Sequence, residues 1–437
     1  MSRRFRAPVV LPADPSCSLL RDAVVDVDDD GRISYVGTAA DAPDAAGAEV
    51  VQLSGILTPG LINTHAHSPM ALLRGMGGDL PLLRWLQEII WPVEAKLVPS
   101  DVRTGMLLGS VEMLRHGVTT SAEMYFEGEQ IADAALTTGS RVLIGPPVMD
   151  IPGMDWRAQL AGIDAWIDAD GLRFGAGDRV ELTYGPHSAY TLSEEALRLT
   201  AESANSRGAL VQIHVAEAAN EDEHVRKEHG SVPLLLEKVG MLAGRVVAAH
   251  AIHLSDEDIA LFAKYGTGVG HCPGSNAKLA SGFSRLIDLR NAGVNVGLGT
   301  DGPASNDDLD LWEEMQLAPM FQRLVNQDST ILTAADSFLL ATRGGANTLG
   351  RDDIGVLEAG RWADMVHIGT DGPAFFAGLD VPDEQLISNL VWASGSRNVQ
   401  DVWVAGEQVV ADGESTRVDR AKVQADAKEL SARLRSA

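Results

Sequence analysis

Apolar runs of strand length alternate with longer amphipathic stretches between about residues 57 and 355. Each run is short, largely apolar or β-branched, and bounded by polar or glycine residues, which predicts a buried strand. Eight strands that are each followed by a helical stretch are typical of a (β/α)8 barrel, an α/β fold with a parallel sheet. The predicted strands are residues 61–64, 118–121, 141–145, 180–184, 210–214, 246–250, 267–271 and 294–298.

Two of the amphipathic stretches begin with clear helix signals. Ser193 precedes two glutamates, and Ser255 precedes three acidic residues. A serine side chain can accept a free N–H group of the first helical turn, and acids in that turn interact favourably with the helix dipole. These signals predict helices over residues 193–207 and 255–264.

The two ends of the chain share a different pattern, made of short strands and turns. Two β-rich segments flank the turn sequence Asp28-Asp29-Asp30-Gly31, which predicts a hairpin. We expect a small β-sandwich domain assembled from residues 1–57 and 355–415, with the TIM-type barrel inserted at 58–354. The charged, alanine-rich residues 416–437 predict a C-terminal helix.

Composition narrows the class of partner. Of the 437 residues, 61 are acidic and 35 are Lys or Arg, which gives a formal net charge of -26. Such acidity argues against nucleic acid or an anionic membrane as a partner. With only 2 cysteines and no apolar segment of signal-peptide or membrane-spanning length, we expect a soluble, cytoplasmic protein that acts on a small molecule.

Polar residues that suit catalysis follow the predicted strands. In a (β/α)8 barrel the active-site residues sit at the C-terminal ends of the strands. Histidines occupy these positions repeatedly, and an acid follows the last strand. The set consists of His65, His67, His187, His214 with Glu217 beyond it, His250, His271 and Asp301.

Four of these residues form a ligand set for one divalent metal ion. His65, His67 and His214 offer imidazoles and Asp301 offers a carboxylate, a set that suits zinc and also iron. A second metal on this architecture would need a bridging lysine at strand four, and residues 181–190 contain none. A bound metal lowers the pKa of a water, so that Glu217 can move its proton. His250 can orient the nucleophile or polarise the group under attack.

The motifs at the strand ends resemble those of the amidohydrolase superfamily, in its cytosine-deaminase-like mononuclear branch. They are HAH at 65–67, HVAE at 214–217, HAIH at 250–253, HCPGSN at 271–276 and GTDGPASN at 299–306. The resemblance implies the same four metal ligands, Glu217 as proton shuttle and His250 beside the nucleophile. It also implies a homo-oligomer, a dimer or a tetramer.

A finer resemblance lies in residues 72–94. The segments LLRG at 72–75, WL at 85–86 and WPVE at 91–94 are similar to those of S-adenosylhomocysteine/5′-methylthioadenosine deaminases. That resemblance implies that Glu94 holds the ribose hydroxyls, that His187 contacts the purine and that Trp85 packs against the nucleoside. The chemistry agrees, because a carboxylate can accept two hydrogen bonds from a vicinal diol.

The resulting hypothesis is a hydrolytic deaminase of 6-aminopurine nucleosides that releases ammonia. The 5′ group stays open, because no motif fixes Arg141 or Arg157 as the partner of a homocysteine carboxylate. One alternative is a chlorotriazine hydrolase, or a deaminase of a free guanine-like or pterin base, on the same scaffold; neither would need Glu94. A third reading is an inactive barrel that serves as a binding protein, which the intact ligand set and Glu217 disfavour.

Overall fold

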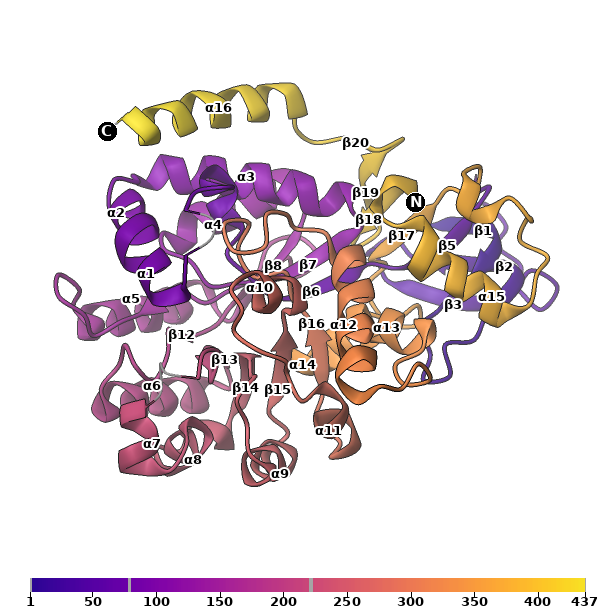
Figure 1. The fold of residues 1–437 in the computed structure, drawn as a ribbon. Helices are drawn as coiled ribbons and strands as arrows, with labels where there is room; N and C mark the ends of the chain where they lie inside the picture. The colour runs from indigo at the N-terminus through magenta and orange to yellow at the C-terminus, as the bar shows by residue number, and fades with distance from the viewer. Residues whose placement is uncertain (1, 78–79, 220–222, 437) are drawn as a thin grey trace.

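A parallel barrel of eight strands forms the centre of the molecule (Figure 1). The computed structural model describes residues 2–77, 80–219 and 223–436. The barrel strands are β6 (Leu61–Ala66), β7 (Val118–Glu123), β8 (Arg141–Ile144), β11 (Val180–Leu182), β13 (Leu210–Val215), β14 (Arg245–His250), β15 (Gly268–His271) and β16 (Val296–Leu298). All eight predicted strands are therefore confirmed, each with its ends shifted by at most two residues.

Two short contacts close the barrel. The strands pair in the orders β11-β8-β7-β6 and β13-β14-β15-β16, all in parallel. A parallel bridge between Tyr184 and Val211 joins one end of the two sets, and a bridge between Ala66 and Asp301 joins the other. The second closure lies at the carboxyl end of the strands, beside the predicted site.

Helices surround the barrel on the outside (Figure 1). Ser193 accepts the N–H of Ala196 at the start of α6, and Ser255 forms a capping box with Asp258 at the start of α9, as the sequence predicts. The surrounding helices are α3 (Pro99–Arg115), α4 (Gly128–Thr138), α5 (Trp156–Asp170), α6 (Glu194–Arg207), α8 (Val232–Lys238), α9 (Asp256–Tyr265), α11 (Leu286–Asn291), α12 (Leu311–Asn326), α13 (Ala334–Ala341) and α14 (Arg343–Thr348).

Short helical segments extend the loops at the carboxyl ends of the strands. After β6 the chain forms η1 and then a nearly continuous helical run, which carries the resemblance at residues 85–94. The segments are η1 (Ser68–Leu73), α1 (Leu82–Trp85), η2 (Leu86–Ile90), α2 (Trp91–Glu94), α7 (Glu223–His229) and α10 (Pro273–Lys278). They position side chains over the mouth of the barrel.

Strands from both termini combine in one nine-stranded sheet. The order is β20-β19-β18-β17-β5-β1-β2-β3, with β4 paired to β1, so β5 links the N-terminal to the C-terminal strands. The strands are β1 (Arg3–Val10), β2 (Leu20–Val27), β3 (Ile33–Thr38), β4 (Glu49–Gln52), β5 (Ile56–Pro59), β17 (Met365–Ile368), β18 (Val399–Val404), β19 (Glu407–Ala411) and β20 (Glu414–Ser415). The pairings join all nine in a single sheet, so the expected two-sheet sandwich stays unconfirmed.

The two faces of this sheet bury different cores. Ile56 belongs to the apolar core shared with the barrel, whereas the next residue, Leu57, belongs to a separate core on the opposite face. In that second core Phe5 and Trp403 meet edge to face, with ring centroids 5.0 Å apart. Helix α16 (Arg420–Ser436) runs beside α3 at the C-terminal end of the chain (Figure 1). Within the described residues, none of the helices combines the length and apolarity needed to cross a membrane.

A buried ion pair links the barrel to the terminal sheet. Arg141, at the start of β8, donates two hydrogen bonds to Asp364, at 2.9 and 3.0 Å, and both side chains are almost fully buried. Asp364 also accepts the backbone N–H of Ala405 at 2.7 Å. Arg141 therefore lies at the amino end of its strand, at the opposite end of the barrel from the predicted site.

We expect Asp364→Asn to lower the free energy of unfolding by about 3 kcal/mol, because it leaves a buried guanidinium without its carboxylate. Urea denaturation at neutral pH measures this change. The matched control is Glu195→Gln, which breaks the exposed ion pair with Arg157 and should cost about 0.5 kcal/mol or less. Equal losses in the two variants would contradict a linking role for the buried pair.

Candidate metal and substrate site

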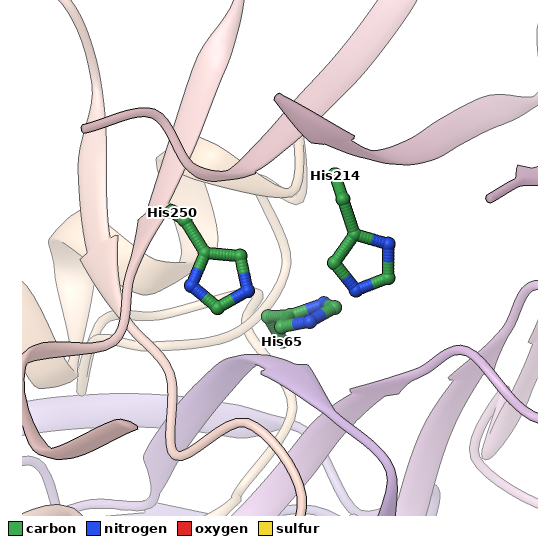
Figure 2. A group of neighbouring side chains, drawn as sticks. All are labelled: His65, His214 and His250. Carbon is green, nitrogen blue, oxygen red and sulfur yellow. The ribbon is translucent and has the colours of Figure 1, made fainter. Parts of the chain in front are cut away.

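Three histidine rings from three strands converge at the carboxyl end of the barrel. Figure 2 shows His214 and His250 side by side, with His65 across from them. The rings of His214 and His250 are nearly parallel, with an interplanar angle of 18° and centroids 5.6 Å apart. The ring of His65 presents its edge to both, at 88° and 74°. The three belong to β6, β13 and β14, so the barrel itself brings them together.

Asp301 and His67 complete the cluster. The Oδ1 atom of Asp301 lies 3.4 Å from Nε2 of His65 and 3.2 Å from Nε2 of His67. Nε2 of His67 in turn lies 3.3 Å from Nε2 of His214. Three of the four residues that the sequence assigned as ligands, His65, His67 and Asp301, thus bring one atom each within 4.8 Å of one another, and His214 approaches this group at His67.

These separations fit a metal ion. Two ligand atoms at about 2.0–2.1 Å from a tetrahedral metal are about 3.3 Å apart, which matches the observed spacings. Nε2 of His65 is buried and has no hydrogen-bond partner among the described residues, as expected of an atom that donates its lone pair to a metal. Nitrogen atoms of His65, His214 and His250 also lie within 4.8 Å of one another.

The second ring nitrogen of each surrounding histidine is held by an oxygen. Nδ1 of His67 lies 2.5 Å from the carbonyl of Met124, and Nδ1 of His214 lies 2.8 Å from the carbonyl of His187. Nδ1 of His250 lies 2.9 Å from Oδ1 of Asn276. A proton on each Nδ1 satisfies these oxygens and leaves each Nε2 free to face the site.

Burial and the carboxylate set the charge of the cluster. Burial lowers the pKa of His65 to about 4 and that of His214 well below its usual value, so both imidazoles are neutral near pH 7. Burial acts to raise the pKa of Asp301, but its close contacts with His65 and His67 hold that pKa well below its ordinary range. Burial also opposes a proton on His67, yet Asp301 raises its pKa to about 9. A metal ion would compete with this proton, since a ligating imidazole is neutral.

Glu217 lies beside the cluster. It is 5% exposed, and its Oε2 is 3.9 Å from Nε2 of His250. The preceding Ala216 and His250 itself have positive φ values, 49° and 65°, as does Asp301 at 60°. These left-handed conformations are unfavourable for residues other than glycine, and they occur where the strands end and the site begins.

A buried glutamate on α12 holds the two loops that support the cluster. Glu314 accepts the backbone N–H of Gly274 and the side-chain amide of Asn306, both at 2.9 Å. Burial raises the pKa of Glu314 well above its usual value. A Cβ atom on Gly274 would lie 2.4 Å from the Glu314 carboxyl, so only glycine fits there.

The loops held by Glu314 contact Asp301 and His250. Ser275, next to Gly274, donates to Oδ2 of Asp301 at 2.6 Å, and Ser305 donates to the same oxygen at 2.7 Å. Asn276 is the residue that holds His250. Ser275, Asn276 and Ser305 lie within motifs recognised in the sequence, but no sequence signal marks Glu314.

A cleft opens over the cluster and holds about 690 Å³ of space, part of which is open solvent. His67, His214, Glu217, His250 and Asp301 line one part of it, while His65 lies buried beneath. The other predicted residues, Trp85, Glu94 and His187, also line this cleft. His271 does not; it is buried beside a separate pocket.

Glu94 is half-buried and has a partner that the sequence did not indicate. Its Oε1 accepts the hydroxyl proton of Tyr125 at 2.7 Å. Burial raises the pKa of Glu94. The other oxygen has no bond to Tyr125, so the carboxyl keeps capacity for a ligand. Trp85, in contrast, donates its indole N–H to the carbonyl of Met76 at 3.1 Å and presents only apolar surface to the cleft.

Comparison with known proteins identifies the family. Residues 56–409 match the model of the amidohydrolase family. The chain belongs to the amidohydrolase family. A 5-methylthioadenosine/S-adenosylhomocysteine deaminase of Haloarcula marismortui is 39% identical over 94% of this chain and 91% of its own. A 5'-deoxyadenosine deaminase of Methanopyrus kandleri is 35% identical over 96% of both chains.

Solved structures of similar proteins share the whole fold of this amidohydrolase. An adenosine deaminase from Xanthomonas campestris with bound zinc has a TM-score of 0.90 and 34% identity, and the match covers 100% of this chain and 99% of that one. The atrazine chlorohydrolase TrzN from Arthrobacter aurescens, complexed with zinc, has a TM-score of 0.88 and 26% identity over 98% of this chain and 100% of its own. The spacing of the His-Asp cluster fits a metal ion, and these neighbours contain zinc. Both observations support a divalent metal centre.

We expect Glu314→Ala to lower kcat at least about 10-fold, because Ser275 and Asn276 would no longer hold Asp301 and His250 in place. Glu314→Gln should keep more of the activity than Glu314→Ala, since the amide oxygen can still accept the Gly274 N–H. Steady-state kinetics with circular dichroism as a folding check compares the two. Equal losses in both variants at intact folding would show that the negative charge, not the clamp, matters.

Proposed function

We propose that this amidohydrolase hydrolyses the 6-amino group of purine nucleosides and releases ammonia. The observation that carries the proposal is that one cleft holds both the metal-binding cluster with Glu217 and the carboxyl of Glu94. The first arrangement suits attack of water on an aminated ring, and the second suits a vicinal diol. The names of the relatives, deaminases of methylthioadenosine, S-adenosylhomocysteine and 5'-deoxyadenosine, support this pairing.

One zinc ion is the proposed metal. His65, His67, His214 and Asp301 would hold it, and two of the structural neighbours contain zinc. Iron would suit the same ligands. When bound, the metal lowers the pKa of a water so that it becomes a nucleophile near neutral pH.

Glu217 is the proposed proton shuttle. It takes one proton from the attacking water and delivers it to the purine ring nitrogen beside C6. The second proton of that water, released from the hydroxyl formed on C6, then goes to the departing amine as the C6–N bond breaks and ammonia leaves. His250, fixed by Asn276, and Asp301, fixed by two serines, keep the water in line with C6. Asp301 also accepts a proton in this scheme.

The remaining predicted residues bind the nucleoside. Glu94 accepts hydrogen bonds from the ribose hydroxyls, with Tyr125 holding its other oxygen. His187 contacts the purine, and burial keeps it neutral by lowering its pKa to about 3. Trp85 provides an apolar wall.

Two further predictions from the sequence belong to this proposal. Residues 1–57 and 355–415 would form a small β-sandwich domain that packs against the barrel. The protein would also assemble as a homo-oligomer, a dimer or a tetramer.

We expect Glu217→Gln to lower kcat at least about 1,000-fold, since the amide cannot carry a proton. The metal content should stay at one ion per chain, because Glu217 is not among the ligands. Plasma emission spectroscopy gives the metal, and ammonia release gives the rate. Glu195→Gln, an exposed acid outside the cleft, is the control. Turnover near the wild-type rate would remove Glu217 from this role.

The alternative substrates, chlorotriazines and free bases, carry no ribose, and Glu94 separates them from nucleosides. A panel of adenosine, 5′-methylthioadenosine, guanine and a chlorotriazine should show turnover of the nucleosides. We expect Glu94→Ala to lower kcat/KM for these about 100-fold, through the loss of charge-assisted hydrogen bonds. Tyr125→Phe, which removes only one donor, should have a smaller effect. Activity confined to guanine or the triazine, unaffected by Glu94→Ala, would establish the alternative.

A further inference from the structure

The cleft lacks the cation of a lysine or an arginine among the described residues that line it. The residues outside the described ranges do not add one, since Gly78, Asp79 and residues 220–222 carry no basic group in the sequence. The lining acids are Glu94, Glu217 and Asp301. Apart from a bound metal, the cleft therefore offers negative charge and neutral surface.

Two basic residues close in sequence to the lining, Arg84 and Lys278, are already paired. Arg84, beside Trp85, donates two hydrogen bonds to Glu88, at 2.7 and 3.0 Å. Lys278, beside Leu279, forms an ion pair of 2.5 Å with Asp307. Each pair would have to break before its cation could bind a ligand.

The two arginines that the sequence left open are also engaged elsewhere. Arg141 is buried in the ion pair with Asp364 at the amino end of its strand. Arg157 pairs with Glu195 at 3.0 Å, and its guanidinium lies 4.0 Å from the ring centre of Trp156. Neither lines the cleft.

An apolar wall adjoins the proposed ribose site. The helical run α1–η2–α2 ends at Glu94, and its earlier turns place Leu82, Trp85, Leu86, Ile90 and Trp91 along the cleft. Leu82, Trp85 and Ile90 are almost fully buried. A substituent on a ribose held by Glu94 therefore meets aliphatic and indole surface. An apolar substituent that is buried against this surface strengthens binding. A charged substituent that is buried there without a partner weakens binding.

We infer that this cleft selects adenosines whose 5′ substituent is uncharged and apolar, such as 5′-deoxy and 5′-alkylthio groups, and rejects a zwitterionic amino acid at that position. The inference rests on the proposed nucleoside deamination and narrows its substrate class. The amino acid of S-adenosylhomocysteine would bring a carboxylate into a cleft whose lining includes three acids and no lysine or arginine.

The test distinguishes the effect of the charge of the 5′ substituent from the effect of its length. The wild-type enzyme is assayed with 5′-methylthioadenosine, 5′-butylthioadenosine and S-adenosylhomocysteine, of which the last two have 5′ groups of similar length. We expect kcat/KM for the butylthio compound within about 10-fold of that for the methylthio compound. We expect S-adenosylhomocysteine to be at least about 100-fold poorer, because its charges find no partner.

A cation introduced in the apolar wall provides a second measurement. Leu86→Arg should raise the ratio of kcat/KM for S-adenosylhomocysteine to that for 5′-butylthioadenosine at least about 10-fold, since a guanidinium can pair with the carboxylate. Leu86→Gln, polar but uncharged, is the matched control and should leave the ratio within about 3-fold of the wild-type value.

The outcomes distinguish this inference from the proposed function. Equal turnover of S-adenosylhomocysteine and the alkylthio compounds would overturn the inference and keep the deaminase. Poor turnover of both long substrates would also overturn it, because length and not charge would then decide. Failure of all adenosine derivatives, with metal bound, would overturn the proposed function itself.

Discussion

The closure of the barrel between its first and last strands is the contact on which the site depends. The backbone N–H of Asp301 donates to the carbonyl of His65 at 3.0 Å, so the residues after the last strand meet the first strand where the HAH segment begins. This bond sets an imidazole and a carboxylate side by side, within 3.4 Å. His214 and His250 then follow from the register of β13 with β14, in which Val215 pairs with His250. The cluster is therefore a result of strand pairing, and no loop needs to fold separately to create it.

A layer of neutral hydrogen bonds supports this arrangement from outside. Carbonyl and amide oxygens hold the histidine rings, serines hold Asp301, and Glu314 holds the loops that carry those groups. Such fixed dipoles orient ligands at low cost, because they are themselves buried and cannot rearrange freely.

The sequence predicted the barrel well because its strands are short apolar runs, and it predicted His65, His67, His214 and Asp301 because they directly follow those runs. It also placed Glu94 and His187 in the cleft that the structure forms. It did not indicate Tyr125 or Glu314, because each acts through a contact between segments far apart in the chain, without a local pattern. Position at a strand end was not sufficient for His271. It ends a strand like the other histidines, yet it lies beside a different pocket. The sequence also did not predict the strand order of the terminal sheet. Strands from the two ends of the chain pair there, and no local pattern indicates which strand pairs with which.

The left-handed backbone at Ala216, His250 and Asp301 has a consequence for the history of this fold. Each such residue costs the native state on the order of 1–3 kcal/mol that a glycine or asparagine would largely avoid. Selection for thermal stability alone would therefore favour replacement of these three residues at the site. A descendant freed from its reaction could gain stability at the mouth of the barrel while keeping every strand, so the same scaffold can survive the loss of its chemistry. The strained strand ends thus favour the geometry of the site at the expense of stability.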